Sequence, residues 1–190
     1  MSPTMGIPMT SPPATGRVSI GVSLAIPDPW GEHLQSSRAS FGDPQAAAVP
    51  PHVTLLPPTE LEADEVVAVE RHLRAVAAGL APFRMRLAGT DTFRPVSPVV
   101  FVKVVEGGEH CDLVQRVVRT GLLRRGLSFP YHPHVTVAHH LDDDSLDLAL
   151  KTLSDFDAEF EVSAFVLYEH GTDGVWRPRR RFVFGEVNAA

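Results

Sequence analysis

The sequence predicts an α+β protein with a bilobal, pseudo-twofold duplicated fold, in which two antiparallel sheets face a central cleft and helices lie on the outside. Three observations predict this class. Segments with the alternating apolar pattern of strands follow segments with the three-to-four spacing of amphipathic helices. The tetrapeptide Pro-His-Val-Thr occurs twice, at residues 51–54 and 133–136. The segments that follow the two copies are similar, which indicates a duplication.

The composition limits the class of protein. Of the 190 residues 44% are apolar, enough for one sizeable core, and no apolar run is long enough to cross a membrane. The single cysteine, Cys111, allows no internal disulfide, which fits a reducing cytoplasm. A net charge of -6 argues against a protein that coats nucleic acid. The arginine-rich stretch at residues 177–181, RPRRR, is still compatible with a small phosphate site.

The chain is expected to hold one domain. Residues 1–16 are rich in Pro, Ser, Thr and Gly, carry no charged side chain and lack the apolar stretch of a secretory signal, so we expect a disordered leader. Residues 17–190 then form a single bilobal domain. A monomer suits such a self-contained fold, and the single cysteine leads us to expect the cytoplasm.

The first half begins with a strand and a short helix. Apolar side chains alternate along residues 17–26, RVSIGVSLAI, which predicts a half-buried strand, and residues 28–42 have the pattern of a short helix. Residues 52–56, HVTLL, predict a second strand. Proline cannot donate a ladder hydrogen bond, so we expect Pro57 and Pro58 to end it.

A long amphipathic helix is predicted over residues 59–80. Thr59 and Glu62 have the spacing of a capping box, and apolar residues then step by three and four from Val66 to Leu80. The elements expected after it are a strand at 83–87, a turn at 89–95, a strand at 99–105, a helix at 111–126, a strand at 134–138, an acidic cap at 141–144, a helix at 145–153, a strand at 160–168, a turn at 169–174 and a strand at 180–187.

The repeat extends beyond the tetrapeptide. Arg94 follows His52 by 42 positions and Arg177 follows His134 by 43. Both arginines stand in an aromatic-Arg-Pro sequence, and a Thr-Asp pair precedes each of them. A duplication is the simplest explanation.

The two tetrapeptides hold the candidate catalytic residues. Residues two apart on a strand point to the same face, so each copy offers a His and a Thr together: His52 with Thr54, and His134 with Thr136. A third His-x-Thr, at residues 170–172, lies in a predicted turn, and we interpret it as an accident of composition.

Two imidazoles and two hydroxyls facing one cleft suit displacement at phosphorus. One neutral imidazole can take a proton from the attacking oxygen while the other, protonated, supplies one to the leaving oxygen. The Thr hydroxyls can donate to the non-bridging oxygens, on which negative charge collects. This chemistry needs no metal and no cofactor, and the chain has no glycine-rich phosphate loop.

Around these residues the sequence resembles the 2H phosphoesterases, and among them the bacterial 2'-5' RNA ligase-like proteins, also described as RNA 2',3'-cyclic phosphodiesterases. The resemblance runs from Val18 to Val187. It implies that His52, Thr54, His134 and Thr136 form the active site. The implied reaction opens 2',3'-cyclic phosphates to 2'-phosphates, with the joining of RNA ends as its reverse. The partner is then an RNA end or a small cyclic nucleotide.

Four further residues are candidates for substrate contact: His139, Arg94, Arg177 and Tyr131. Relatives often carry Arg or Lys shortly after the second motif, where this chain has His139 and His140. Arg94 and Arg177 could supply positive charge instead, or each could stabilise a hairpin. Tyr131 could stack on a base or could belong to the edge of the core.

Two alternatives remain open. His132, His134, His139 and His140 crowd into nine residues and could form a zinc site with Asp142, which would make a zinc-dependent hydrolase. The same cleft could also recognise a nucleotide or an RNA end without turnover. The metal alternative leaves the first motif and the repeat unexplained.

Overall fold

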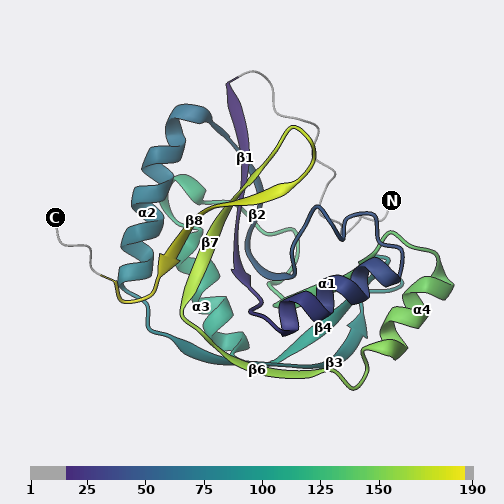
Figure 1. The fold of residues 1–190 in the computed structure, drawn as a ribbon. Coiled ribbons are helices and arrows are strands. Elements are labelled where there is room, and N and C mark those ends of the chain that lie inside the picture. Colours follow the sequence, from purple (N-terminus) through teal and green to yellow (C-terminus); the bar gives the residue numbers. More distant parts are fainter. Residues whose placement is uncertain (1–15, 187–190) are drawn as a thin grey trace.

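The computed structural model describes residues 16–186 (Figure 1). The predicted leader therefore lies, apart from Gly16, outside the described residues. The α+β class is confirmed. The elements are, in chain order, β1 (Arg17–Ala25), α1 (Trp30–Ser40), β2 (His52–Glu62), η1 (Ala63–Glu65), α2 (Val66–Ala78), β3 (Phe83–Thr92), β4 (Val99–Glu106), α3 (Gly108–Val118), η2 (Gly121–Leu123), β5 (His134–His139), α4 (Asp143–Thr152), β6 (Asp157–Val162), β7 (Ala164–His170) and β8 (Trp176–Val183).

The strands form two antiparallel halves, but each half takes strands from both copies of the repeat: β3 and β4, which follow the first motif, lie with β5 and β6, whereas β7 and β8 lie with β1 and β2. The strand order is β6-β3-β4-β5-β2-β1-β7-β8, so that each half holds four strands and the two motif strands, β5 and β2, meet in the middle. In place of two separate sheets, one residue pair, Val53 with Val135, joins the halves into a single sheet. The motifs thus lie on neighbouring strands at the junction of the halves.

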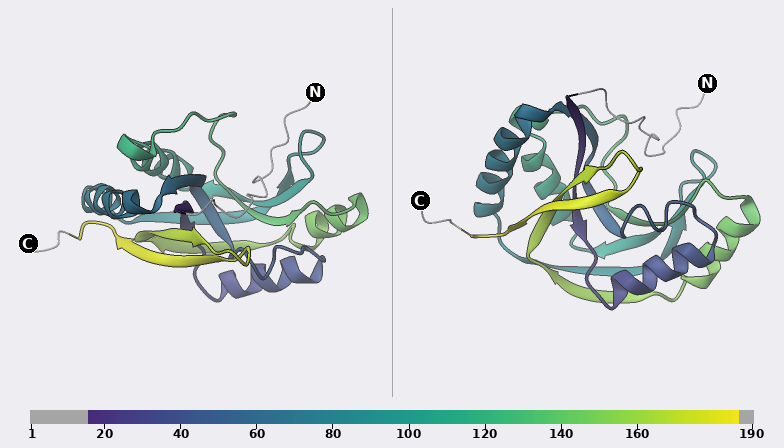
Figure 2. Two further views of the ribbon diagram at one scale, coloured as in Figure 1. Left: turned by 90° about the horizontal axis from the view of Figure 1, so that it is seen from above. Right: turned by 45° about the horizontal axis from the view of Figure 1, so that its top comes forward.

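The sheet is strongly curled. Only Ser163 separates β6 from β7, although the two strands stand first and seventh in the strand order. The sheet must therefore bend until these two positions come close, which Figure 2 shows from two directions. The single strand predicted over 160–168 is wrong for this reason, because its two ends pair with strands of different halves, β3 and β1.

The helices cover the two halves in pairs. In Figure 1, α2 and α3 lie together on one side, where they contact β8 and β2, while α1 and α4 lie on the other side and contact β5. The side chains of α2 that turn inward are those that the three-to-four spacing predicts, beginning with Val66, Val69 and Leu73. Together with the apolar faces of the strands they make one continuous core.

The predicted end of β2 is wrong, because the strand continues through both prolines to Glu62. The register of β1 and β2 shifts between Leu56 and Thr59, so the prolines lie in an irregularity of the ladder. On its other edge β2 pairs with β5 only at Val53. The prolines, which have no N–H group, therefore cost the sheet no ladder hydrogen bond at this position.

Two helix boundaries also differ from the prediction. Thr59 is a buried strand residue, and the capping box before α2 is formed by Glu62 and Glu65 instead. Helix α3 ends at Val118 rather than near residue 126, and Gly121 turns the chain with a positive φ of 57°. At α4 the acidic cap is confirmed, since the carboxylate of Asp142 accepts a hydrogen bond from the N–H of Ser145.

None of the helices in residues 16–186 is both long enough and apolar enough to cross a membrane.

Candidate active site

The two motifs lie side by side with opposite directions. Because Val53 pairs with Val135 in an antiparallel ladder, His52 comes opposite Thr136 and Thr54 comes opposite His134 on the face away from the valines. All four of these side chains line one cavity of about 470 Å³. The sequence predicts this convergence, and the adjacency of the two strands provides it.

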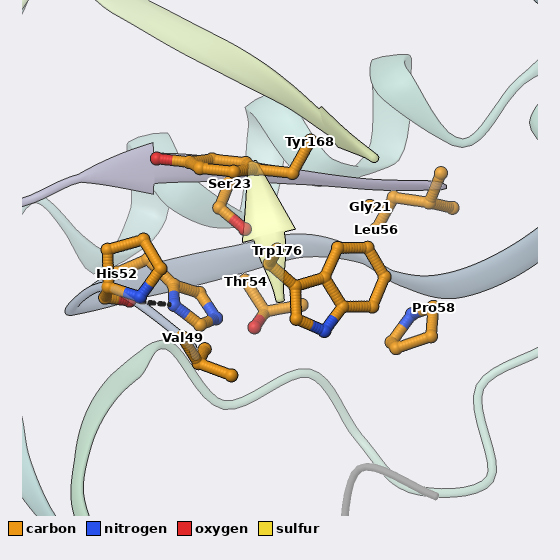
Figure 3. A pocket seen from close by; sticks show the side chains of 10 residues that line it. Gly21, Ser23, Val49, His52, Thr54, Leu56, Pro58, Tyr168 and Trp176 are labelled. Carbon is orange, nitrogen blue, oxygen red and sulfur yellow. Dashed lines mark hydrogen bonds between the residues drawn. The ribbon is translucent and has the colours of Figure 1, made fainter. Parts of the chain in front are cut away.

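Each imidazole is oriented by the carbonyl two residues before it. His52 Nδ1 lies 2.7 Å from the oxygen of Pro50, and His134 Nδ1 lies 2.7 Å from the oxygen of His132. Figure 3 shows the first of these bonds as a dashed line. A carbonyl only accepts, so Nδ1 carries the proton in both rings and Nε2 is left for a ligand.

Burial makes both imidazoles weaker bases than free histidine. It lowers the pKa of His52, and the positive charge of Arg38 lowers it further. Burial also lowers the pKa of His134, to about 4, with smaller contributions from His132 and His52. The ring of Phe93 stands nearly perpendicular to that of His134, with centroids 5.0 Å apart, and helps to exclude water from it. Without a ligand, both rings are mostly neutral at neutral pH.

The two threonine hydroxyls are available. Thr54 and Thr136 are half-buried, and among the described residues neither hydroxyl has a hydrogen-bond partner. A tetrahedral anion beside the imidazoles would therefore meet two unused donors. Its negative charge would also raise the pKa of the nearest imidazole and favour the protonated ring.

A buried arginine, which the sequence reasoning missed, lines the same cavity. Arg38 of α1 is 5% exposed, and its Nε donates to the carboxylate of Asp43 at 2.8 Å. Its Nη1 reaches the carbonyl of Val49 at 3.4 Å. The helical period could have found it, because Arg38 follows the buried Leu34 by four positions and so belongs to the buried face of α1.

Tyr131 lines the cavity but is held by its hydroxyl. From the segment that precedes β5, its O–H donates to the carbonyl of Thr54 on β2 at 2.9 Å, and its ring packs against the core. Burial raises the pKa of this phenol far above its usual range. These contacts favour the second of the two interpretations of Tyr131, an aromatic residue at the edge of the core, over a base-stacking residue.

Arg94 and Arg177 are not among the residues that line the cavity. Arg94 is paired with two carboxylates of α4, Asp143 at 3.2 Å and Asp147 at 2.5 Å. Arg177 is paired at 2.6 Å with Asp173 of its own hairpin. Arg177 therefore stabilises its own hairpin, the alternative that the sequence left open, whereas Arg94 links the turn between β3 and β4 to helix α4.

His139 and His140 do line the cavity, and their rings stack with centroids 3.7 Å apart. His139 is 8% exposed, and its Nε2 is buried without a hydrogen-bond partner. Burial lowers its pKa to about 4, and the neighbouring His140 lowers it further. At neutral pH His139 is therefore uncharged and does not supply the positive charge that an Arg or Lys would bring at this point.

The zinc alternative has no geometric support in residues 16–186. No group of three or more His, Cys, Asp or Glu side chains in this part of the chain is arranged to hold a metal ion. His132 and His134 lie together, with ring centroids 5.8 Å apart, whereas His139 and His140 form a separate stacked pair.

The buried state of His139 predicts a loss of stability in acid. Its pKa is about 4 in the folded protein and about 6.5 in the unfolded chain, so the unfolded chain takes up the proton first as the pH falls. The stabilisation is complete above about pH 6.5 and is lost between there and about pH 4, by about 3 kcal/mol in all. Urea unfolding from about pH 7 to pH 5 should show about 2 kcal/mol of this loss, and the His139→Leu variant should lack it. An equal pH dependence in both proteins would contradict the assignment.

Comparison with known proteins assigns the family. The model of the 2'-5' RNA ligase superfamily matches residues 26–174. A curated protein of Bacillus licheniformis is 34% identical over 156 residues, which cover 81% of this chain and 92% of that protein. One of Bacillus pumilus is 36% identical over 160 residues, 82% of this chain and 91% of that protein. Both bear phosphoesterase names.

Solved structures show the same fold. Escherichia coli LigT in complex with NADP+ superimposes with a TM-score of 0.68 at 18% identity, over 90% of this chain and 99% of that one. The structure named TT0787 from Thermus thermophilus superimposes with a TM-score of 0.63 at 22% identity, over 88% of this chain and 98% of that one. From the match of the family model and the identities with curated relatives, the chain belongs to the 2'-5' RNA ligase superfamily, among the 2H phosphoesterases.

Proposed function

We propose that the protein opens 2',3'-cyclic phosphates, on RNA ends or on nucleotides, by metal-independent acid-base catalysis. The observation that carries the proposal is the matched pair of motifs on adjacent strands. Each motif offers one imidazole with a free Nε2 and one hydroxyl with no partner to the same cavity. Structures of E. coli LigT in complex with 3'-AMP and with NADP+ are consistent with a nucleotide ligand in this fold.

The proposed reaction is an in-line displacement at phosphorus. Water attacks phosphorus as one imidazole takes its proton on Nε2, and the bond from phosphorus to the 3' oxygen breaks as the other imidazole donates a proton to that oxygen. The product is a 2'-phosphate. Thr54 and Thr136 donate hydrogen bonds to the non-bridging oxygens, where charge accumulates. The same displacement, with a 5' hydroxyl of RNA attacking phosphorus in place of water and the 3' oxygen leaving, would form a 2'-5' linkage.

Both histidines have lowered pKa values, so the imidazole that acts as the acid becomes protonated only when the substrate is bound. The cyclic phosphate carries one negative charge, which favours a protonated imidazole beside it. Arg38, tied to Asp43, stays beside His52 and opposes its protonation. The substrate thus creates the charged and neutral pair that the mechanism needs.

A substrate panel tests the proposal. We expect the purified protein to convert adenosine and cytidine 2',3'-cyclic phosphates to 2'-phosphates in the presence of EDTA, with the product isomer identified by phosphorus NMR. Saturable binding without turnover would favour the non-catalytic binding module. Turnover that vanishes with EDTA and returns with zinc would favour the metal-dependent hydrolase. The cytoplasmic location and the monomeric state stay predictions.

A further inference from the structure

A small apolar recess opens beside the first motif. It is lined by His52 and Thr54 and, further from the motif, by Gly21, Leu56, Pro58, Tyr168 and Trp176. Figure 3 shows the indole of Trp176 between Thr54 and Pro58, with the imidazole of His52 on the other side of Thr54. Trp176 also lines the large cavity, so its ring lies where the recess meets the candidate phosphate site.

The indole is held in place by a backbone hydrogen bond and by ring contacts, none of which uses its N–H group. The backbone N–H of Trp176 donates to the carbonyl of Ala48 at 2.9 Å. Its ring packs beside His170, its partner on β7, with centroids 4.8 Å apart and an angle of 38°. Its six-membered ring also lies over Gly21, where an added Cβ would come within 3.4 Å of the indole. Such a fixed ring loses little freedom when a ligand binds.

Trp176 belongs to the repeat, as the aromatic residue of the second aromatic-Arg-Pro sequence. Its counterpart in the first copy of the sequence repeat is Phe93, which also lines the large cavity. The ring of Phe93 is occupied, however, because it packs on Phe101 at 4.4 Å and contacts His134 at 5.0 Å. The duplication therefore brought an aromatic ring to each motif, and the ring beside His52 is the one that borders an open recess.

Tyr131, the base-stacking candidate of the sequence, is less suited to the task. Its hydroxyl is bound to the carbonyl of Thr54, and its ring packs against the core. Trp176 is half-buried, and its indole N–H has no hydrogen-bond partner among the described residues. Of the two, Trp176 is the one that can receive a planar ligand.

We propose that Trp176 forms the nucleobase subsite of this enzyme, a proposal that rests on the phosphoesterase function proposed above. A base linked through ribose to a phosphate at His52 and Thr54 would stack on the indole. The recess, of about 40 Å³, is too small to enclose a base, so the base would lie against the indole on the side of the large cavity, which Trp176 also lines. Stacking tolerates every base, so the subsite selects nucleotides over cyclic phosphates that carry no base and discriminates weakly among the four bases.

The first test measures selectivity. We expect kcat/KM for adenosine 2',3'-cyclic phosphate to exceed that for 1-O-methylribose 2',3'-cyclic phosphate by about 5-fold to 150-fold, the range of one stacked base. The Trp176→Ala variant should bring this ratio close to one, and Trp176→Phe should keep part of it. The matched control is Trp30→Phe, since Trp30 stacks on Phe160 away from the cavity and its replacement should leave the ratio unchanged.

The second test measures binding without turnover. The chain has two tryptophans, so Trp176 is the only one left in Trp30→Phe. We expect adenosine 2'-phosphate to quench its fluorescence saturably, and inorganic phosphate to quench it much less. Equal turnover of both substrates by the wild type, or no saturable quenching by the nucleotide, overturns the subsite even if the phosphoesterase function stands. Saturable quenching without turnover of either substrate supports the subsite and rejects the proposed function.

Discussion

Replacing either motif histidine by alanine should lower kcat for a 2',3'-cyclic nucleotide at least about 100-fold, because each proton transfer contributes about 10²–10⁴ to the rate. Each ring makes a single hydrogen bond, to the carbonyl two residues before it. Its removal leaves few partners unsatisfied, so His52→Ala and His134→Ala should fold normally. The double variant should be little worse than the poorer single variant, since acid and base act in one step. The measurement is single-turnover kinetics with circular dichroism to check folding.

The matched control is His132→Ala. His132 lines the same cavity and its ring lies 5.8 Å from that of His134, but it lies outside the motif. Its carbonyl, which orients His134, is retained in the variant. We expect a loss of less than about tenfold, well below the general acid-base contribution. A loss as large as that of His134→Ala would contradict the assignment of the acid-base pair.

The pH profile of the wild type gives an independent reading of the same pair. Burial lowers the pKa of both histidines, so at neutral pH few enzyme molecules without substrate carry the protonated imidazole that must act as the acid. We expect a bell-shaped profile of kcat/KM that is centred on the acid side and falls as the pH rises through neutrality. The bound phosphate favours the imidazolium, so the profile of kcat should be centred at higher pH. If the profiles of kcat and of kcat/KM both showed only one titrating limb, a pair of histidines acting as acid and base would be excluded.

The catalytic candidates could be predicted because their signal is local and repeated. A tetrapeptide on a strand places His and Thr on one face whatever the rest of the chain does. The neighbour relation of β2 and β5, which joins the two expected sheets, could not be predicted in this way. It depends on one pair, Val53 with Val135, whose residues are far apart in the sequence. Alternation shows which side of a strand is buried and leaves its partner strand undefined.

The same alternation explains why Arg177 lies elsewhere. Neighbouring residues of a strand point to opposite sides, so where Trp176 of β8 turns to the cavity, Arg177 after it turns away. Arg94 follows β3 in a turn, where the alternation of a strand no longer applies, and its side chain pairs with α4 instead. The sequence shows that the aromatic-Arg-Pro unit is repeated, but not which of its side chains faces inward. Arg38 shows the reverse case, since its place on the buried face of α1 follows from the helical period.

The buried pair of Arg38 and Asp43 predicts the largest loss of stability. Their side chains are 6% and 0% exposed, and the carboxylate also accepts the N–H of Gln45 at 2.8 Å. Asp43→Ala would leave a buried guanidinium without its counter-charge, which typically costs about 3–5 kcal/mol. Urea unfolding should show this loss in the free energy of unfolding. Replacing both partners, as in Arg38→Met with Asp43→Ala, should restore part of it, because no unpaired charge then stays buried.

The control is an exposed pair of the same chemistry. Arg86 and Asp157 make two hydrogen bonds, at 3.0 and 2.6 Å, with side chains 41% and 49% exposed. Water solvates both charges when the pair is broken, so Asp157→Ala should destabilise the protein far less than Asp43→Ala. The buried pair also fixes the segment that leads to Pro50, whose carbonyl orients His52. If Asp43→Ala proves as stable as Asp157→Ala, the guanidinium of Arg38 must reach water in the cavity, and it is then free to meet a phosphate there.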